Sequence, residues 1–118
     1  MLYAGARVRV GPGATVRQVN ARLARHGRKL GPDPASEIAC TIGGVVANNS
    51  SGMACGVTQN TYQTLESAII VLPSGTIVDS SRPDADARLA DTDPGLHAAL
   101  RLLRAQLLAD EVSAAEVA

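Results

Sequence analysis

The chain has 118 residues, enough for one modest domain, and 11 Lys and Arg balance 11 Asp and Glu, so its formal net charge is zero. This balance argues against nucleic-acid binding, which normally needs a basic excess, and the longest apolar run, 68–72, is far too short to cross a membrane. The first ten residues lack the basic-then-apolar profile of a secretory signal, so we expect a cytoplasmic protein.

The core must be aliphatic, because the sequence contains no Trp, no Phe and only two Tyr. Cys40 and Cys55 are the two cysteines, and a single pair at this spacing matches no zinc or iron–sulfur ligand pattern. We therefore expect two reduced thiols that pack as small apolar groups, and no metal site.

The chain opens with a strand, a turn and a helix. Polar and apolar residues alternate over 6–10, which predicts a strand with one buried face, and Gly11-Pro12-Gly13 ends it. Thr15 is an expected helix N-cap, and Gln18 completes a capping box. Val16, Val19 and Leu23 have helical spacing and predict the buried face of that helix, which should end at Gly27.

A long irregular segment follows, and it is the most informative part of the chain. Its polar, glycine-rich groups are Gly31-Pro32-Asp33-Pro34, Cys40-Thr41-Ile42-Gly43-Gly44 and Asn48-Asn49-Ser50-Ser51-Gly52. Loops of this length in a small domain usually have a function of their own. Within it, residues 43–48 predict a helical turn whose first amides point outward and accept an anionic group.

The second half reads as a hairpin and a helix. Residues 65–72 predict a strand buried on both faces, Pro73-Ser74-Gly75 a tight turn, and 76–79 the returning strand. The polar stretch 80–93 predicts a surface loop with at most a short turn near 86–89. Asp93-Pro94 then predicts a helix start, and Leu96, Leu100, Leu103 and Leu107 its apolar stripe.

The three groups of the long loop together closely resemble FAD-linked oxidoreductases of the vanillyl-alcohol-oxidase/PCMH type. Within that family the chain is most similar to the branch of D-lactate dehydrogenases and glycolate oxidase FAD subunits. The resemblance extends to Val8-Arg9-Val10-Gly11-Pro12-Gly13 before the loop and Val71-Leu72-Pro73-Ser74-Gly75 after it, and so covers about residues 8–79.

The resemblance implies an α+β fold, with a small mixed or antiparallel sheet and flanking helices, that binds FAD between two subdomains. We expect residues 1–118 to form the second half of such an FAD-binding domain. The family's upstream pyrophosphate loop and its downstream substrate or cap domain are then expected to lie outside this sequence.

The resemblance also implies which residues contact the flavin. Backbone amides of Gly43 and Gly44, with Ile42 beside them, should lie against the flavin or its phosphates, and Pro32, Asp33 and Pro34 should form a stiff edge of the pocket. Thr41 and Asn48 should hydrogen-bond flavin carbonyls or ribityl hydroxyls. Ser51 and Gly52 should lie near the pyrophosphate.

Each of these residues also has an ordinary structural interpretation. The double glycine can serve a tight turn between core elements, and the Pro-Asp-Pro group a surface turn after a helix. Thr41 and Asn48 can cap local turns, and Ser51 and Gly52 can form a solvent-facing turn. No arrangement of Ser, His and acidic residues has enough context to predict a catalytic residue.

The expected function is therefore FAD binding within an oxidoreductase that acts on a small 2-hydroxy acid such as D-lactate or glycolate. The segment alone should have no turnover and weak or no affinity for FAD. The alternative is a non-catalytic α+β module that keeps the flavin-type loop and acts in protein association. Either way, exposed apolar surface should favour homo-oligomers.

Overall fold

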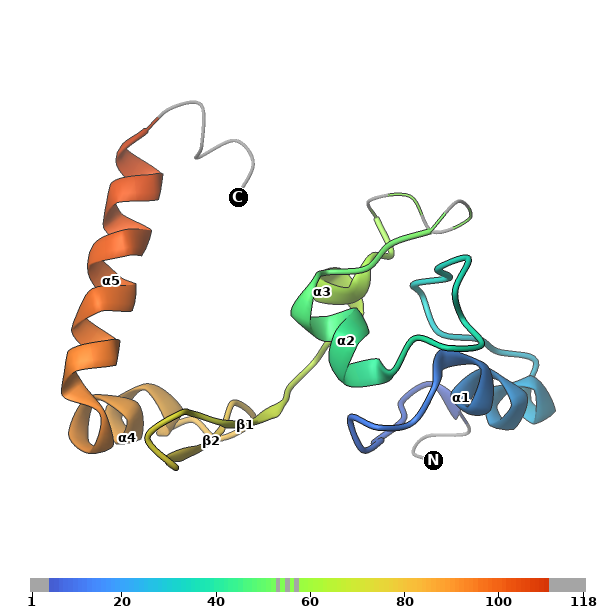
Figure 1. Ribbon diagram of the computed structural model, residues 1–118, viewed down its shortest axis with the longest axis horizontal. Coiled ribbons are helices and arrows are strands. Elements are labelled where there is room, and N and C mark those ends of the chain that lie inside the picture. Colours follow the sequence, from blue (N-terminus) through green and yellow to red (C-terminus); the bar gives the residue numbers. More distant parts are fainter. Residues whose placement is uncertain (1–4, 53, 55, 57, 111–118) are drawn as a thin grey trace. The chain divides into compact units, whose positions relative to one another are not determined.

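The computed structural model of the chain describes residues 5–52, 54, 56 and 58–110. The chain divides into two units, residues 1–65 and 66–118 (Figure 1). Unit 1 contains helices and loops, and unit 2 contains a two-stranded antiparallel sheet with two helices, so the predicted α+β class is confirmed. The elements in chain order are α1 (Val16–Leu23), η2 (Ala24–His26), α2 (Ile42–Ala47), α3 (Thr61–Thr64), β1 (Ile69–Val71), β2 (Ile77–Asp79), α4 (Ala85–Thr92) and α5 (Pro94–Ala109).

Helix α1 begins and ends as its sequence predicts. The Gln18 amide donates to Thr15 Oγ1 (3.2 Å) and the Thr15 amide donates to Gln18 Oε1 (3.0 Å), which is the complete capping box. The 3₁₀ turn η2 follows, and Gly27 ends it in the left-handed region with φ 64°. Each end of this helical segment is thus determined by residues close in sequence.

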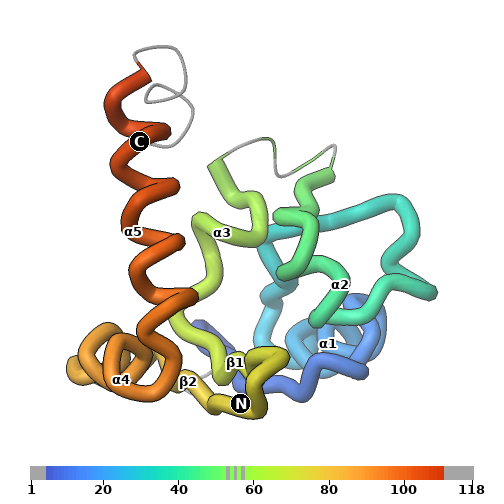
Figure 2. The backbone as a smooth tube through the Cα atoms, turned by 60° about the vertical axis from the view of Figure 1, so that its left-hand side comes forward, coloured from blue at the N-terminus to red at the C-terminus, as the bar shows by residue number. Residues whose placement is uncertain are grey.

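The core of unit 1 is small. Val16, Val19 and Leu23 of α1 and Val45 of α2 are the buried apolar side chains of the described residues. Their helical spacing on α1 is the predicted buried stripe. Helices α2 and α3 lie side by side (Figure 2).

The strand predicted over residues 6–10 does not form. Arg7 is a single bridge residue, and 8–10 have no regular structure. A strand needs a neighbour that completes its ladder of hydrogen bonds, and the described residues supply none along 8–10. The alternating pattern thus indicated a preference for extended backbone, but no neighbouring strand among the described residues pairs with 8–10.

The hairpin of unit 2 forms at the predicted turn, but its burial differs from the prediction. Ile69 pairs with Asp79 and Val71 with Ile77, while the Gly75 amide donates to the Leu72 carbonyl. The first strand covers only Ile69–Val71, and all three side chains are exposed, Val71 by 67%. The expected double burial of 65–72 is wrong, because within the described part of unit 2 the sheet has two strands and α4 covers only one of its faces.

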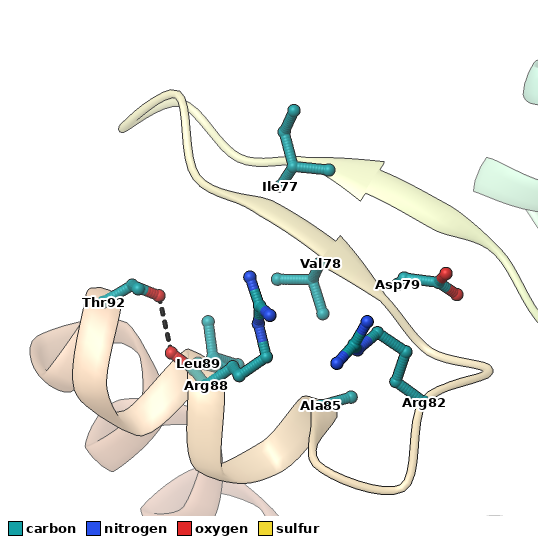
Figure 3. Close-up of a pocket in the computed structure, with 8 residues that line it drawn as sticks. All are labelled: Ile77, Val78, Asp79, Arg82, Ala85, Arg88, Leu89 and Thr92. Atoms are coloured by element: carbon teal, nitrogen blue, oxygen red, sulfur yellow. Dashed lines mark hydrogen bonds between the residues drawn. The ribbon is translucent and has the colours of Figure 1, made fainter.

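The stretch predicted as a surface loop contains α4, a two-turn helix. Val78 of β2 faces Ala85 and Leu89 of α4, whereas Ile77 points away from the helix (Figure 3). Helix α5 begins at Pro94 as predicted, although the Asp93 side chain makes no capping hydrogen bond. α5 packs on α4, and His97 Nε2 lies 3.0 Å from Asp86 Oδ1.

Cys40 carries a free, half-buried thiol, and Cys55 lies outside the described residues. No group of residues in the described part of the chain has the composition of a metal site. A search of the same residues for a helix long and apolar enough to span a membrane found none.

Candidate functional site

Two of the three glycine-rich groups of the long loop, 31–34 and 48–52, come together in unit 1. The closest approach is between Gly52 and Asp33: a Cβ atom added to Gly52 would lie 2.6 Å from the Asp33 carbonyl carbon. A Cβ at Gly31 would lie 2.7 Å from the carbonyl oxygen of Gln59. Glycine is therefore required at both positions so that one stretch of backbone can pass against another.

Asp33 lies at the centre of this contact. Its carboxylate is 3.4 Å from Lys29 Nζ, and its side chain is only 21% exposed compared with 60% for Lys29. Pro32 beside it is buried, which holds this turn against the rest of unit 1. The structure thus places Pro32, Asp33 and Gly52 together, as a stiff edge would require.

The segment 48–52 is fixed by α3. The buried Thr61 hydroxyl donates to the Ser50 carbonyl (2.7 Å), and the Thr61 amide donates to the same oxygen (3.0 Å). The Tyr62 amide donates to Asn49 Oδ1 (3.0 Å), and Asn49 adopts a positive φ of 48°. Sequence reasoning missed Asn49 and Thr61; the signal for Asn49 was its residue type, since Asn tolerates this backbone region.

The amides around the double glycine are not directed outward. The Ile42 amide donates to the Ala14 carbonyl (2.8 Å), and the Gly43 amide donates to the Pro12 carbonyl (2.9 Å). The Gly44 amide donates to Thr41 Oγ1 (3.4 Å). The expectation of outward-pointing amides that bind an anion is wrong, because the turn 11–14 and the Thr41 cap already occupy them.

The two neighbouring glycines of α2 differ in their surroundings. A Cβ at Gly43 would lie 3.0 Å from Pro12 Cβ and 3.3 Å from its carbonyl oxygen, so packing explains this glycine. A Cβ at Gly44 would meet only Thr41 Oγ1, at an ordinary 3.5 Å, and Gly44 is exposed. Glycine in a helix costs up to about 1 kcal/mol relative to alanine, so the fold alone does not account for Gly44.

The ten predicted contact residues fall into two groups within unit 1. Thr41 is the N-cap of α2 and Asn48 its C-cap, so they lie at opposite ends of a six-residue helix, about 10 Å apart along its axis. Ile42, Gly43 and Gly44 lie with Thr41; Pro32, Asp33 and Pro34 lie with Gly52. Thr41, Gly44, Asn48 and Ser51 are exposed.

Two hollows of the surface lie in unit 2, away from these residues. Between β2 and α4 is a cavity of about 20 Å³, room for one water molecule (Figure 3). At its rim, a hydrogen bond from Arg82 lowers the pKa of Asp84, and the same bond raises the pKa of Arg82. A shallow groove of about 400 Å³ runs between α4 and α5. Both are lined by unit 2 residues and contain none of the ten.

Comparison with known proteins decides the family. A family described as FAD binding domain matches residues 3–81. The chain belongs to this family. FAD is therefore the cofactor of its domain.

Two curated relatives are both named glycolate oxidase subunit GlcD, from Escherichia coli strain K12 and from E. coli O6:H1. Each is 37% identical over 81 residues, which covers 62% of this chain and 16% of the relative. The chain thus spans about a sixth of their length. No solved structure matches.

The described residues fit an FAD contact through their outer surface rather than through an amide cradle. The open side of Gly44 and the exposed Thr41, Asn48 and Ser51 can border a flat ring system or a ribityl chain. The amides of Ile42, Gly43 and Gly44 cannot take part without breaking hydrogen bonds that hold α2.

Proposed function

We propose that residues 1–118 form part of the FAD-binding domain of an oxidoreductase that acts on a small 2-hydroxy acid such as glycolate or D-lactate. The proposal rests on membership of the FAD-binding family and on the identity with GlcD. The bound cofactor would supply a hydride acceptor, and this chain's residues would hold and orient it.

The observation that carries the proposed contact is Gly44, an exposed helical glycine with space for a side chain. Its bare surface leaves room for a ligand to approach the backbone of α2. The Thr41 hydroxyl beside it still has acceptor capacity, because among the described residues it accepts a hydrogen bond only from the Gly44 amide. Asn48 and Ser51 would contact the cofactor from the far end of the helix, beside the Asp33–Gly52 edge.

A flavin titration tests this contact. FAD fluorescence should be quenched saturably by the chain with weak affinity, and Gly44→Leu should weaken binding at least about tenfold because its side chain occupies the approach. Gly95→Leu is the matched control, since a Cβ at this exposed helical glycine of α5 meets nothing within 4 Å. Equal binding by both variants and the parent would contradict the contact.

The exposed apolar residues of unit 2 favour a second candidate, an association module. Ile69, Val71 and Ile77 of the hairpin are each at least 60% exposed, and Leu102 of α5 is 61% exposed. Exposed apolar side chains on a two-stranded sheet promote pairing with a strand of another chain. Sedimentation that shows dimers without any FAD binding, even at millimolar FAD, would favour this function over the first.

A further inference from the structure

The balanced charge of the chain conceals a strong segregation between its two units. Residues 1–65 contain six arginines and one lysine against Asp33 and Glu37, a formal net charge of +5. Residues 66–118 contain four arginines against nine acidic residues, a formal net charge of −5. Such an asymmetry between two parts of one chain points to a charged partner for each.

The positive charge of unit 1 lies largely on the helical segment α1–η2 and its flanks. Arg17 and Arg25 are eight residues apart, on the side of the helix opposite Val16, Val19 and Leu23. Arg9, Arg17, Arg22, Arg25 and Arg28 are all exposed. None of these five forms an ion pair with a carboxylate in the described part of the chain.

The negative charge of unit 2 is densest at α4. Asp84, Asp86, Asp91 and Asp93 lie within ten residues that contain one arginine, so 84–93 carries a net charge of −3. Asp84 and Asp86 have partners in Arg82 and in His97 and Arg101. Over the described ranges, neither Asp91 nor Asp93 is in an ion pair.

We propose that the arginine face of α1–η2 in one copy docks on the acidic α4 segment, residues 84–93, of a second copy. The planar guanidinium groups suit carboxylates, to which they donate paired hydrogen bonds. The formal net charges of the two units, +5 and −5, are equal in size and opposite in sign, so the basic unit of one copy attracts the acidic unit of another. This proposal goes beyond flavin binding and does not depend on it.

The arginine face itself selects against other anionic partners. Between its arginines lie Ala21 and Ala24, with no large apolar side chain that could insert into a membrane. It also has no Phe, Tyr or Trp side chain on which a nucleic-acid base could stack. We therefore take a carboxylate-rich protein surface as the partner of these arginines.

Because the two surfaces differ, the contact is heterologous, and one copy can engage a neighbour at each end. The mean mass in sedimentation velocity should therefore rise beyond the dimer as the chain is concentrated. The apparent dissociation constant should increase at least about tenfold between about 50 and 500 mM NaCl, because exposed ion pairs are screened. Apolar association would be unchanged or strengthened by the same salt.

Two matched charge reversals test the surfaces. R17E/R25E and R101E/R104E change the total charge equally, but only the first removes the docking face. We expect R17E/R25E to be monomeric at low salt and R101E/R104E to associate at least as well as the parent. A parent chain that stays monomeric, association that is insensitive to salt, or equal effects of both variants would overturn the proposal.

A mixing experiment identifies the second surface. D91K/D93K should also be monomeric alone, since it reverses the two carboxylates of the α4 segment that form no ion pair among the described residues. When mixed with R17E/R25E, it should form a mixed complex, because its intact arginine face meets the intact α4 segment of R17E/R25E and the two reversed surfaces also have opposite charges. Circular dichroism establishes that each variant is folded, and a mixture of folded variants that remains monomeric contradicts the pairing.

Discussion

Gly52→Ala is expected to unfold unit 1. The new Cβ would lie 2.6 Å from the Asp33 carbonyl carbon, and backbone, unlike a side-chain tip, cannot turn aside. Overpacking of this kind costs about 3 kcal/mol or more. Unit 1 has four buried apolar side chains among its described residues, and at roughly 0.05 kcal/mol per residue its 65 residues supply only about 3 kcal/mol.

Urea unfolding followed by far-UV circular dichroism measures this effect. The matched control is Gly13→Ala, in the same unit, where a Cβ meets nothing within 4 Å. The control should unfold within about 1 kcal/mol of the parent. If Gly52→Ala were as stable as Gly13→Ala, the close contact between the 31–34 and 48–52 segments would not exist.

Alanine at the two glycines of α2 is expected to change stability in opposite directions. Gly43→Ala should destabilise unit 1 by about 1–3 kcal/mol, because its Cβ lies 3.0 Å from Pro12 Cβ. Gly44→Ala should stabilise it by up to about 1 kcal/mol, because alanine favours the helix and has space. Thermal or urea unfolding of the two variants in parallel measures the difference.

The sign at position 44 decides what the double glycine is for. A stabilised Gly44→Ala variant means that the parent chain retains a residue that weakens its fold, as sites adapted to a ligand often do. If Gly44→Ala were destabilised as much as Gly43→Ala, packing would account for both glycines. Gly44 would then need no ligand to explain it.

Features set by near neighbours could be predicted from the sequence. The Thr15–Gln18 capping box, the end of the helical segment at Gly27 and the turn at Gly75 each depend on residues within a few positions. Their geometry follows from local hydrogen bonds and from the backbone freedom of glycine. The family resemblance, carried by the spacing of the loop groups, was confirmed by the match to the FAD-binding domain.

Features that need a distant partner could not be predicted in the same way. The Gly43 amide is occupied by the Pro12 carbonyl, about thirty residues earlier, so no local pattern indicates it. The apolar run of β1 predicts a buried strand, but it does not indicate whether another element of the described chain packs against that strand. Helix α4 was missed because its apolar face is narrow, formed by Ala85 and Leu89 among acidic residues.

The same distinction applies to the candidate site. Residue types and spacing identified the loop, and the contact between Asp33 and Gly52 joins two of its groups. Gly43 is explained by packing against Pro12, whereas Gly44 has space for a side chain. This difference depends on the surroundings of each Cβ position, which only the fold specifies. The predicted flavin contacts therefore remain proposals whose most specific element is the open side of Gly44.

The most direct measurement is a two-dimensional ¹H–¹⁵N spectrum of the labelled chain during titration with FAD, which detects even millimolar binding. We expect the amide shifts caused by FAD to concentrate at Thr41, Gly44, Asn48 and Ser51. These shifts should be lost in Gly44→Leu but retained in Gly95→Leu. Shifts confined to the α4–α5 groove, or no shifts up to the solubility limit of FAD, would contradict this expectation.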